Sequence, residues 1–250
     1  EDGYHEVRMI MQMINLYDRI TLRRSTEPGI RVTTNLPYLP VNEDNLVYRA
    51  AKLLMDEFQV TEGVEIELQK YIPVAAGMAG GSSDAAAVMV GVNRIFHLGL
   101  TKKQLMERGV KIGADVPFCI MRGTALAEGI GEKLSSLPPM VKCPVLIAKP
   151  AVSVSTKFVY QNLKLNEQTP HPDIDALITD IRNSDLDNIC ADMGNVLETV
   201  TIPNYPVIAQ IKEQMLKSGA KASMMSGSGP TVFGLFGDEE TARRARAEMK

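Results

Sequence analysis

Apolar residues recur at strand or helix spacing along most of the first half of the chain. Residues 64–69 alternate strictly between apolar and polar side chains, the pattern of a strand with one buried face. In residues 45–58 the apolar positions follow the helical period, which predicts an amphipathic helix. A capping-box pattern at residues 101–104 predicts another helix, which ends near Gly113. Further strands are expected within residues 8–22, as one or two strands, and over residues 31–34.

The remaining predicted elements follow other patterns. Residues 84–92 are apolar nearly all round, so we expect a helix buried on most of its sides. Prolines between residues 138 and 144 mark a connection, after which residues 145–148 predict a strand. The elements predicted beyond it are helices over 156–165, 173–182, 207–217 and 239–249, and a strand over 232–236. This order favours an α+β architecture of two domains over a doubly wound sheet.

Composition and charge narrow the class of protein. Of the 250 residues, 45% are hydrophobic and 23% are charged, which excludes disordered, collagen-like and disulfide-scaffold chains. The formal net charge is −3, so no overall positive field would hold a nucleic acid. The least charged stretch, residues 71–93, is broken by a proline and several glycines, and predicts no membrane-spanning helix. We therefore expect neither nucleic acid nor membrane as a partner.

The three cysteines and two of the three histidines carry little chemistry. Cys119, Cys143 and Cys190 form no C-x-x-C pair, so we expect reduced, buried thiols in a cytoplasmic protein, with neither zinc nor disulfides. His97 and His171 lack partners at the spacing of metal ligands.

The sharpest chemical signal is the glycine-rich segment at residues 73–83, which follows a predicted strand and opens a predicted helix. Glycines let backbone N–H groups approach an anion, and a helix N-terminus favours negative charge, so phosphate is the expected ligand. The segment matches neither a Walker A motif nor G-x-G-x-x-G. A tight turn that lets a helix pack on a sheet would explain the glycines equally well. Asp84 suits a helix N-terminus but would repel phosphate unless it points away or acts through a cation.

Three other segments have both a chemical and a plain structural interpretation. The loop at residues 226–231 contains two glycines and two serines, and is either a ligand loop or, more commonly, a simple turn. Asp115 lies among small and apolar residues, where it could orient a hydroxyl or, as the commoner alternative, satisfy backbone N–H groups of a turn. Residues 2–5 are most often a surface turn, although Tyr4 could stack on a base and His5 could hydrogen-bond to it.

Taken in order, these segments resemble the GHMP kinases, named for galactokinase and for homoserine, mevalonate and phosphomevalonate kinases. The resemblance spans almost the whole chain and rests on residues 2–5, 43–46, 72–87, 113–118, 123–129 and 226–231. It implies an α+β, two-domain GHMP kinase fold with the active site in the cleft between the domains. The N-terminal, ATP-binding domain is expected at residues 1–141 and the C-terminal domain at residues 142–250.

The resemblance also implies roles for individual residues. Asp115 matches the catalytic aspartate, which orients or deprotonates the acceptor hydroxyl. Tyr4 is expected to stack on a cytosine ring, and His5 to hydrogen-bond to its edge. The implied ATP site consists of Pro73, Val74, Ala75, Ala76, Gly77, Met78, Ala79, Gly80, Gly81, Ser82 and Ser83, with Asn45 and Lys70 at the adenosine. The implied acceptor site consists of Tyr4, His5, Tyr160, Gly227, Ser228 and Gly229.

The reaction implied is ATP-dependent phosphorylation of the C2 hydroxyl of a cytidine-diphosphate-linked methylerythritol, in non-mevalonate isoprenoid synthesis. Mg²⁺ is expected with ATP, and its protein ligand, Ser83 or a water held by Asp84, stays unassigned. The protein is expected to be a monomer or a homodimer. The family places a strand with a lysine and an asparagine before the segment that matches residues 2–5, and the printed sequence, which begins at Glu1, does not contain it.

Two alternatives remain open. The first is a GHMP kinase with another acceptor, such as homoserine or mevalonate, against which Tyr4 and His5 argue because those acceptors carry no base. The second is a non-catalytic nucleotide-binding homologue. This alternative is favoured because the printed sequence does not contain the family's lysine. It is opposed by the presence of Asp115, which matches the catalytic aspartate.

Overall fold

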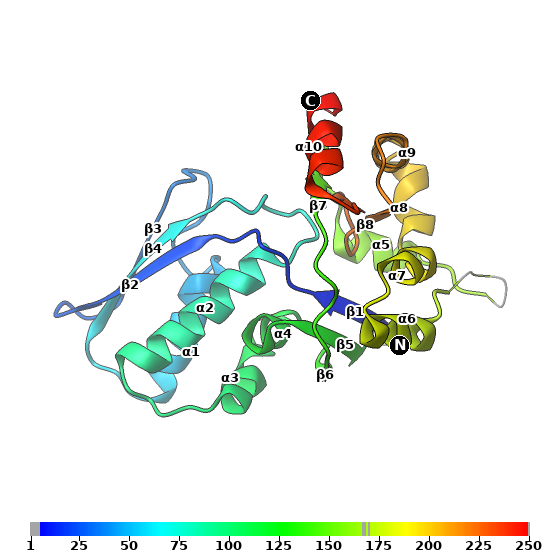
Figure 1. Ribbon diagram of the computed structural model, residues 1–250. Helices are drawn as coiled ribbons and strands as arrows, with labels where there is room; N and C mark the ends of the chain where they lie inside the picture. Colours follow the sequence, from blue (N-terminus) through cyan, green and yellow to red (C-terminus); the bar gives the residue numbers. More distant parts are fainter. Residues whose placement is uncertain (1–5, 167–168, 170, 250) are drawn as a thin grey trace. The chain divides into compact units, whose positions relative to one another are not determined.

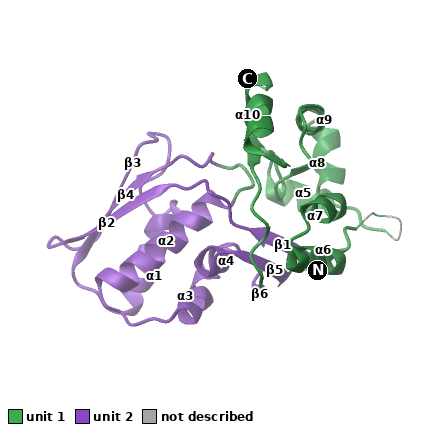
Figure 2. Cartoon of the chain, in the orientation of Figure 1, with its two compact units in different colours: residues 1–5, 75–78, 137–250 green, residues 6–74, 79–136 purple. Residues whose placement is uncertain are grey.

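The structure is a computed structural model that describes residues 6–166, 169 and 171–249. The chain forms two compact units (Figure 2). Unit 2 contains Glu6–Val74 and Ala79–Ser136. Unit 1 contains, among the described residues, Ala75–Met78 and the chain from Leu137 onward. The expected domain boundary at residues 141–142 stays a prediction.

Unit 2 contains two three-stranded sheets (Figure 1). In the first, β1 (Val7–Gln12) and β6 (Lys133–Leu137) flank β5 (Thr124–Gly129), and β1 runs antiparallel to β5. In the second, β4 (Gly63–Gln69) lies between an antiparallel β2 (Arg19–Ser25) and a parallel β3 (Ile30–Thr34). The alternation in β4 places Val64, Ile66 and Leu68 in the core, as the sequence predicts.

Helices complete unit 2. The pair α1 (Leu46–Glu57) and α2 (Gly80–Ile95) pack on each other and on the β2–β4–β3 sheet. The short helices α3 (Lys102–Gly109) and α4 (Val116–Met121) pack together, and both contact α2. The predicted capping box is present at the start of α3. Leu54 of α1 and Met89 of α2 are fully buried in the core that these elements share.

The described residues of unit 1 include an antiparallel sheet in which β9 (Val232–Leu235) lies between β7 (Val145–Ala148) and β8 (Ala222–Met225). Its core contains Phe236, Ile208 and Met215, all fully buried. Its helices are α5 (Thr156–Asn162), α6 (Ile174–Asn183), α7 (Leu186–Asp192), α8 (Glu198–Asn204), α9 (Val207–Lys217) and α10 (Glu239–Glu248).

The structure corrects several details of the sequence prediction. The helix expected to end near Gly113 ends at Gly109, and the residues after it form turns in which Lys111 N donates to Arg108 O and Ile112 N to Gly109 O. Residues 80–83 form the first turn of α2 instead of a loop before it. Of the cysteines expected to be buried, only Cys119 is, while Cys143 and Cys190 are half-buried. The sequence prediction did not identify β5, β6, β8, α4, α7 or α8.

Candidate active site

The first turn of α2 is formed by the last four residues of the glycine-rich segment. Helix α2 has no side-chain cap, because its N-cap residue is Ala79, with φ +50°. The first N–H groups of a helix have no acceptor within it, so this turn presents unpaired donors and the positive end of a 16-residue helix. Such a turn binds phosphate without any lysine.

Two glycines allow other segments to approach this turn. A methyl group at residue 80 would lie 2.9 Å from Ile72 Cγ2 and 3.3 Å from Lys70 Nζ, and one at residue 81 would lie 3.3 Å from Leu46 Cδ1. The end of β4 and the start of α1 are therefore both packed against the N-terminus of α2.

Asn45, expected at the adenosine, is the N-cap of α1. Its side chain accepts a hydrogen bond from Val47 N at 3.0 Å and donates one to Pro40 O at 2.7 Å. The residue is buried. Asn45 thus shapes the chain beside the α2 turn, and its contact with adenosine stays a prediction.

Asp115 lies at the N-cap position of α4 and is half-buried. Its side chain makes no capping hydrogen bond, so the role of satisfying the turn that follows is not observed. Burial raises the pKa of its carboxyl group above the ordinary value. The backbone of Gly113 lies against Ser82 of α2, since a methyl group there would be 3.9 Å from Ser82 Oγ. The segment that leads into Asp115 therefore lies beside the first turn of α2, and the Asp115 carboxylate is not used as a helix cap.

The pKa of the Cys119 thiol reflects both burial and the two carboxyl groups near it. Burial, followed by the negative charges of Asp115 and Asp84, raises the pKa of its thiol to about 12. A thiol with such a pKa stays protonated and is a poor nucleophile, so Cys119 is read as a core residue.

The ammonium group of Lys70 is buried between the carboxylates of Asp18 and Asp84, with Asp84 Oδ2 at 2.8 Å. Burial opposes ionisation of Asp18, but the ammonium group and the N–H groups of Tyr71 and Ile72 outweigh it and lower the pKa of Asp18. Burial raises the pKa of Asp84 to about 7, against the effect of Lys70. Asp84 therefore binds a cation within the protein, which is one of the two arrangements that would reduce its repulsion of a phosphate group.

The two glycine-rich loops of the sequence meet in unit 1. Gly77 has φ +71°, and its carbonyl oxygen accepts a hydrogen bond of 2.7 Å from Ser226 Oγ. A methyl group at residue 77 would lie 2.5 Å from Ser226 O and 2.8 Å from Gly229 O. Only glycine allows this backbone contact between segments far apart in the sequence.

The loop at residues 226–231 is held by polar side chains that the sequence prediction missed. Asn195 donates hydrogen bonds of 2.8 Å to both Met225 O and Gly227 O, and the buried Thr201 donates one of 3.3 Å to Ser228 O. These residues lie in or before α8, a helix too short to show a period, so no sequence signal marked them.

Of the remaining residues predicted for the acceptor site, the structure describes some and not others. Ser228 is buried, and its hydroxyl lies 2.8 Å from that of Thr156, the first residue of α5. Tyr160 is on the same helix and is half-buried. Tyr4 and His5 lie outside the described residues.

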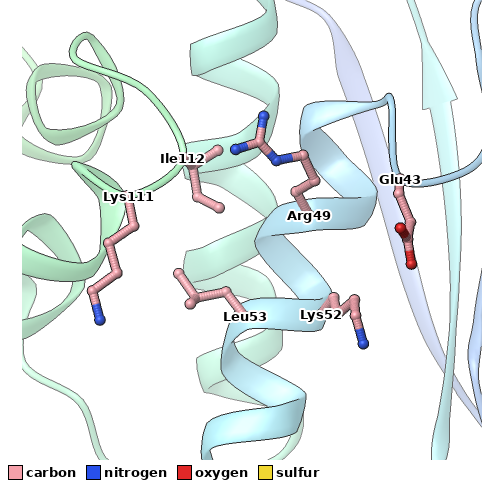
Figure 3. Close-up of a pocket in the computed structure, with 6 residues that line it drawn as sticks. All are labelled: Glu43, Arg49, Lys52, Leu53, Lys111 and Ile112. Carbon is pink, nitrogen blue, oxygen red and sulfur yellow. The ribbon is translucent and has the colours of Figure 1, made fainter.

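A shallow pocket of about 370 Å³ on unit 2 does not coincide with these residues (Figure 3). It lies between α1 and the loop that follows α3, and none of the predicted site residues lines it. It is lined by Glu43, Arg49, Lys52, Leu53, Lys111 and Ile112.

Within the described ranges no cluster of three or more His, Cys, Asp or Glu side chains could hold a metal ion. No helix in the part of the chain described here is long and apolar enough to cross a membrane.

Comparison with known families matches both halves of the chain. The family of GHMP kinases N-terminal domains matches residues 45–123, and that of GHMP kinases C-terminal domains matches residues 177–250. The chain belongs to the GHMP kinase family. The first match contains Asn45, the α2 turn and Asp115, and the second contains the loop at residues 226–231.

Individual GHMP kinases are similar to this chain along nearly its whole length. A protein of Lachnospira eligens named 4-diphosphocytidyl-2-C-methyl-D-erythritol kinase is 57% identical over 96% of this chain and 84% of its own length. A protein of the same name from Lachnoclostridium phytofermentans is 56% identical over 100% of this chain and 86% of its own length. The crystal structure of a 4-(cytidine 5'-diphospho)-2C-methyl-D-erythritol kinase, 30% identical, has a TM-score of 0.84 and covers 100% of this chain and 88% of that chain.

These matches confirm the α+β, two-domain GHMP kinase fold and the family expected from the sequence. They also confirm an enzyme of the phosphotransferase class with an alcohol group as acceptor. Because a kinase takes its phosphoryl group from ATP, membership of this GHMP kinase family implies ATP as co-substrate.

Proposed function

We propose that this GHMP kinase transfers the γ-phosphoryl group of ATP to the C2 hydroxyl of 4-diphosphocytidyl-2-C-methyl-D-erythritol, giving the 2-phosphate and ADP. The product is a precursor in the non-mevalonate route to isoprenoids. The observation that carries this proposal is the 57% identity over 96% of the chain to a kinase of that name. The geometry supports it, because the α2 turn would hold phosphate oxygens and Asp115, a carboxyl group in the same unit, would hold the acceptor hydroxyl.

Phosphoryl transfer depends mainly on positioning and on stabilising the charge that spreads over the phosphoryl oxygens. The N–H groups of Gly80, Gly81 and Ser82 would hold phosphate oxygens at the positive end of α2. Asp115, with its pKa raised by burial, would accept the hydrogen bond or the proton of the C2 hydroxyl and hold it in line with the γ-phosphorus. Lys70 and Asn45 would lie on the adenosine side of the same turn.

Mg²⁺ bound together with ATP is part of the proposal. Mg²⁺ prefers oxygen ligands and usually takes most of them from phosphates and water. The hydroxyl group of Ser83, in the first turn of α2, is an oxygen donor of the kind that fits such an ion. When bound, the ion neutralises charge on the phosphate oxygens. Asp84 Oδ2 is engaged by Lys70 at 2.8 Å, so we favour Ser83 over a water held by Asp84.

The acceptor site is proposed to consist of Tyr4, His5, Tyr160 and the loop residues Gly227, Ser228 and Gly229. Tyr4 would stack on cytosine, His5 would bond to the edge of the base, and the loop would approach the acceptor with its backbone. A cytoplasmic location and a monomeric or homodimeric state complete the proposal.

A coupled ADP-release assay on the full-length protein tests this function. The assay contains ATP and Mg²⁺ with 4-diphosphocytidyl-2-C-methyl-D-erythritol, homoserine or mevalonate as acceptor. We expect turnover with the cytidylyl acceptor alone, and a loss of kcat by about 10²–10⁴-fold in Asp115→Asn, because the amide cannot accept the proton. ATP binding without turnover on any acceptor would contradict the proposal and leave a nucleotide-binding protein of this fold.

A further inference from the structure

Three charged side chains from three separate segments form a buried cluster in unit 2, the Asp18–Lys70–Asp84 cluster. Asp18 lies between β1 and β2, Lys70 follows β4, and Asp84 is in α2. Their side chains are only 2%, 4% and 5% exposed, respectively. Lys70 Nζ contacts the carboxylates of both Asp18 and Asp84. Nothing in the sequence pattern connected these residues, and the proposed chemistry does not use either carboxylate.

Asp18 also fixes the backbone that leads into the glycine-rich segment. Its Oδ1 accepts hydrogen bonds from Tyr71 N at 2.5 Å and from Ile72 N at 2.8 Å. Ile72 immediately precedes Pro73, the first residue of the segment. The carboxylate of Asp18 thus has three donors and holds the start of the segment from one side.

Asp84 and Gly80 fix the other end. Asp84 binds the same ammonium group from the α2 side, at 2.8 Å. Gly80 packs so closely on Lys70 and Ile72 that a methyl group at residue 80 would lie within 3.3 Å of both. Both ends of the glycine-rich segment are therefore attached to one ammonium group.

Stability alone does not explain a buried cluster of this kind. Removing charged groups from water opposes folding, and apolar residues of similar volume often stabilise a core equally well or better. A cluster of two carboxylates and one ammonium group does, however, fix geometry, because each charged hydrogen bond is short and directional. A loop with both ends fixed also loses less conformational entropy when it closes on a ligand.

We propose that Asp18 and Asp84, acting through Lys70, are positioning residues that hold both ends of the glycine-rich segment in the conformation that binds the phosphates of ATP. The inference rests on the proposed function in assigning this segment to ATP. It goes beyond that function in giving two carboxylates outside the reacting centre a role in nucleotide affinity.

The test compares nucleotide affinity and kinetics in Asp18→Asn, Asp18→Ala and Asp84→Asn with a matched control. Asp56→Asn removes one negative charge from an exposed ion pair, Lys52–Asp56, in the same unit. The dissociation constant of ATP is measured directly by calorimetry, well below each variant's unfolding temperature. The KM values for ATP and for the cytidylyl acceptor are measured in the ADP-release assay.

We expect Asp18→Asn to weaken ATP binding roughly tenfold, the factor that corresponds to freeing one or two immobilised side chains. Asp18→Ala should weaken it more, because it also removes the acceptor for the two N–H groups. Asp84→Asn should raise the KM for ATP as Asp18→Asn does. The KM for the acceptor should stay unchanged in every variant, and Asp56→Asn should match the wild-type protein in both constants.

A merely structural role would give a different result. Lower unfolding temperatures, with the ATP dissociation constant and both KM values unchanged in the folded protein, would overturn the inference. If Asp18→Ala does not fold, the two asparagine variants decide, since each keeps an oxygen acceptor of the same size. ATP binding that weakens as expected in a protein without acceptor turnover would contradict the proposed function and support the positioning role. A wild-type protein that binds no ATP would contradict both.

Discussion

The contact between the two glycine-rich loops of unit 1 makes Gly77→Ala an informative substitution. Gly77 combines two requirements for glycine: a positive φ of +71° and a backbone contact that leaves no room for a side chain. A β-carbon there would lie 2.5 Å from Ser226 O and 2.8 Å from Gly229 O, and both are backbone atoms that no side-chain rotation can move away. The loops must therefore separate, or the alanine must remain strained.

The positive φ and the close backbone contact contribute separately to the free energy of unfolding. A non-glycine residue in the left-handed region is destabilised by about 1–2 kcal/mol. Forcing an additional carbon into a close-packed position destabilises by a further 1–3 kcal/mol or so. We therefore expect Gly77→Ala to lower the free energy of unfolding by about 2–5 kcal/mol. Because the displaced loop carries the proposed phosphate-binding segment, the KM for ATP should also rise.

Gly99 is a matched control for the effect of the positive φ alone. It has φ +72°, and a β-carbon there would meet nothing within 4 Å. Urea unfolding of Gly99→Ala should therefore show the loss of about 1–2 kcal/mol due to backbone strain, with an unchanged KM for ATP. If the two variants lose the same free energy of unfolding within about 0.5 kcal/mol, the close approach of the loops contributes nothing and the reasoning is refuted.

Three further predictions concern other parts of the site and the core. The acid limb of the kcat/KM pH profile should have its midpoint above the ordinary aspartate pKa of 3.8, because burial raises the pKa of Asp115 and the proposed mechanism uses its ionised form. Glu198→Ala should lower the free energy of unfolding by about 1–3 kcal/mol in urea, since it leaves Lys212 and Met225 N without their acceptor. Leu54→Ala should lower it by about 2–5 kcal/mol, because the side chain is fully buried.

Each of these has a contrary outcome. An acid limb at or below pH 3.8 would show that Asp115 is not the titrating group or that burial does not perturb it. Glu213→Ala, which removes an exposed ion pair with Lys217, should leave the free energy of unfolding nearly unchanged. An effect of Glu198→Ala no larger than that would show that its two part-buried hydrogen bonds do not stabilise the fold. Leu216→Ala, at a half-exposed position, should be much milder than Leu54→Ala.

Elements with a long and regular pattern were predictable from the sequence. The strict alternation of β4 and the amphipathic pattern of α1 leave one arrangement that buries the apolar side chains, and the structure has it. The short helices α4, α7 and α8, of six or seven residues, contain too few turns to show a period. Their formation depends on the tertiary surfaces on which they pack.

The candidate site was predictable only as a set of segments. The glycine-rich segment and Asp115 stand out by residue type, and their functional roles stay predictions that the proposed assays test. Asp18 did not stand out, because a single aspartate between two strands is a common turn residue. Only the position of Lys70, 52 residues further along the chain, shows what Asp18 binds.

The sequence by itself determined the local conformations and the order of motifs that identifies the family, because both depend on residues close together in the chain. The tertiary structure decided which charged groups share a buried space, which carboxyl groups have raised pKa values, and which loops touch. Gly77 and Ser226 are 149 residues apart, yet one hydrogen bond joins them. Such contacts depend on how whole elements pack, since burial and electrostatic fields are summed over all neighbours in space.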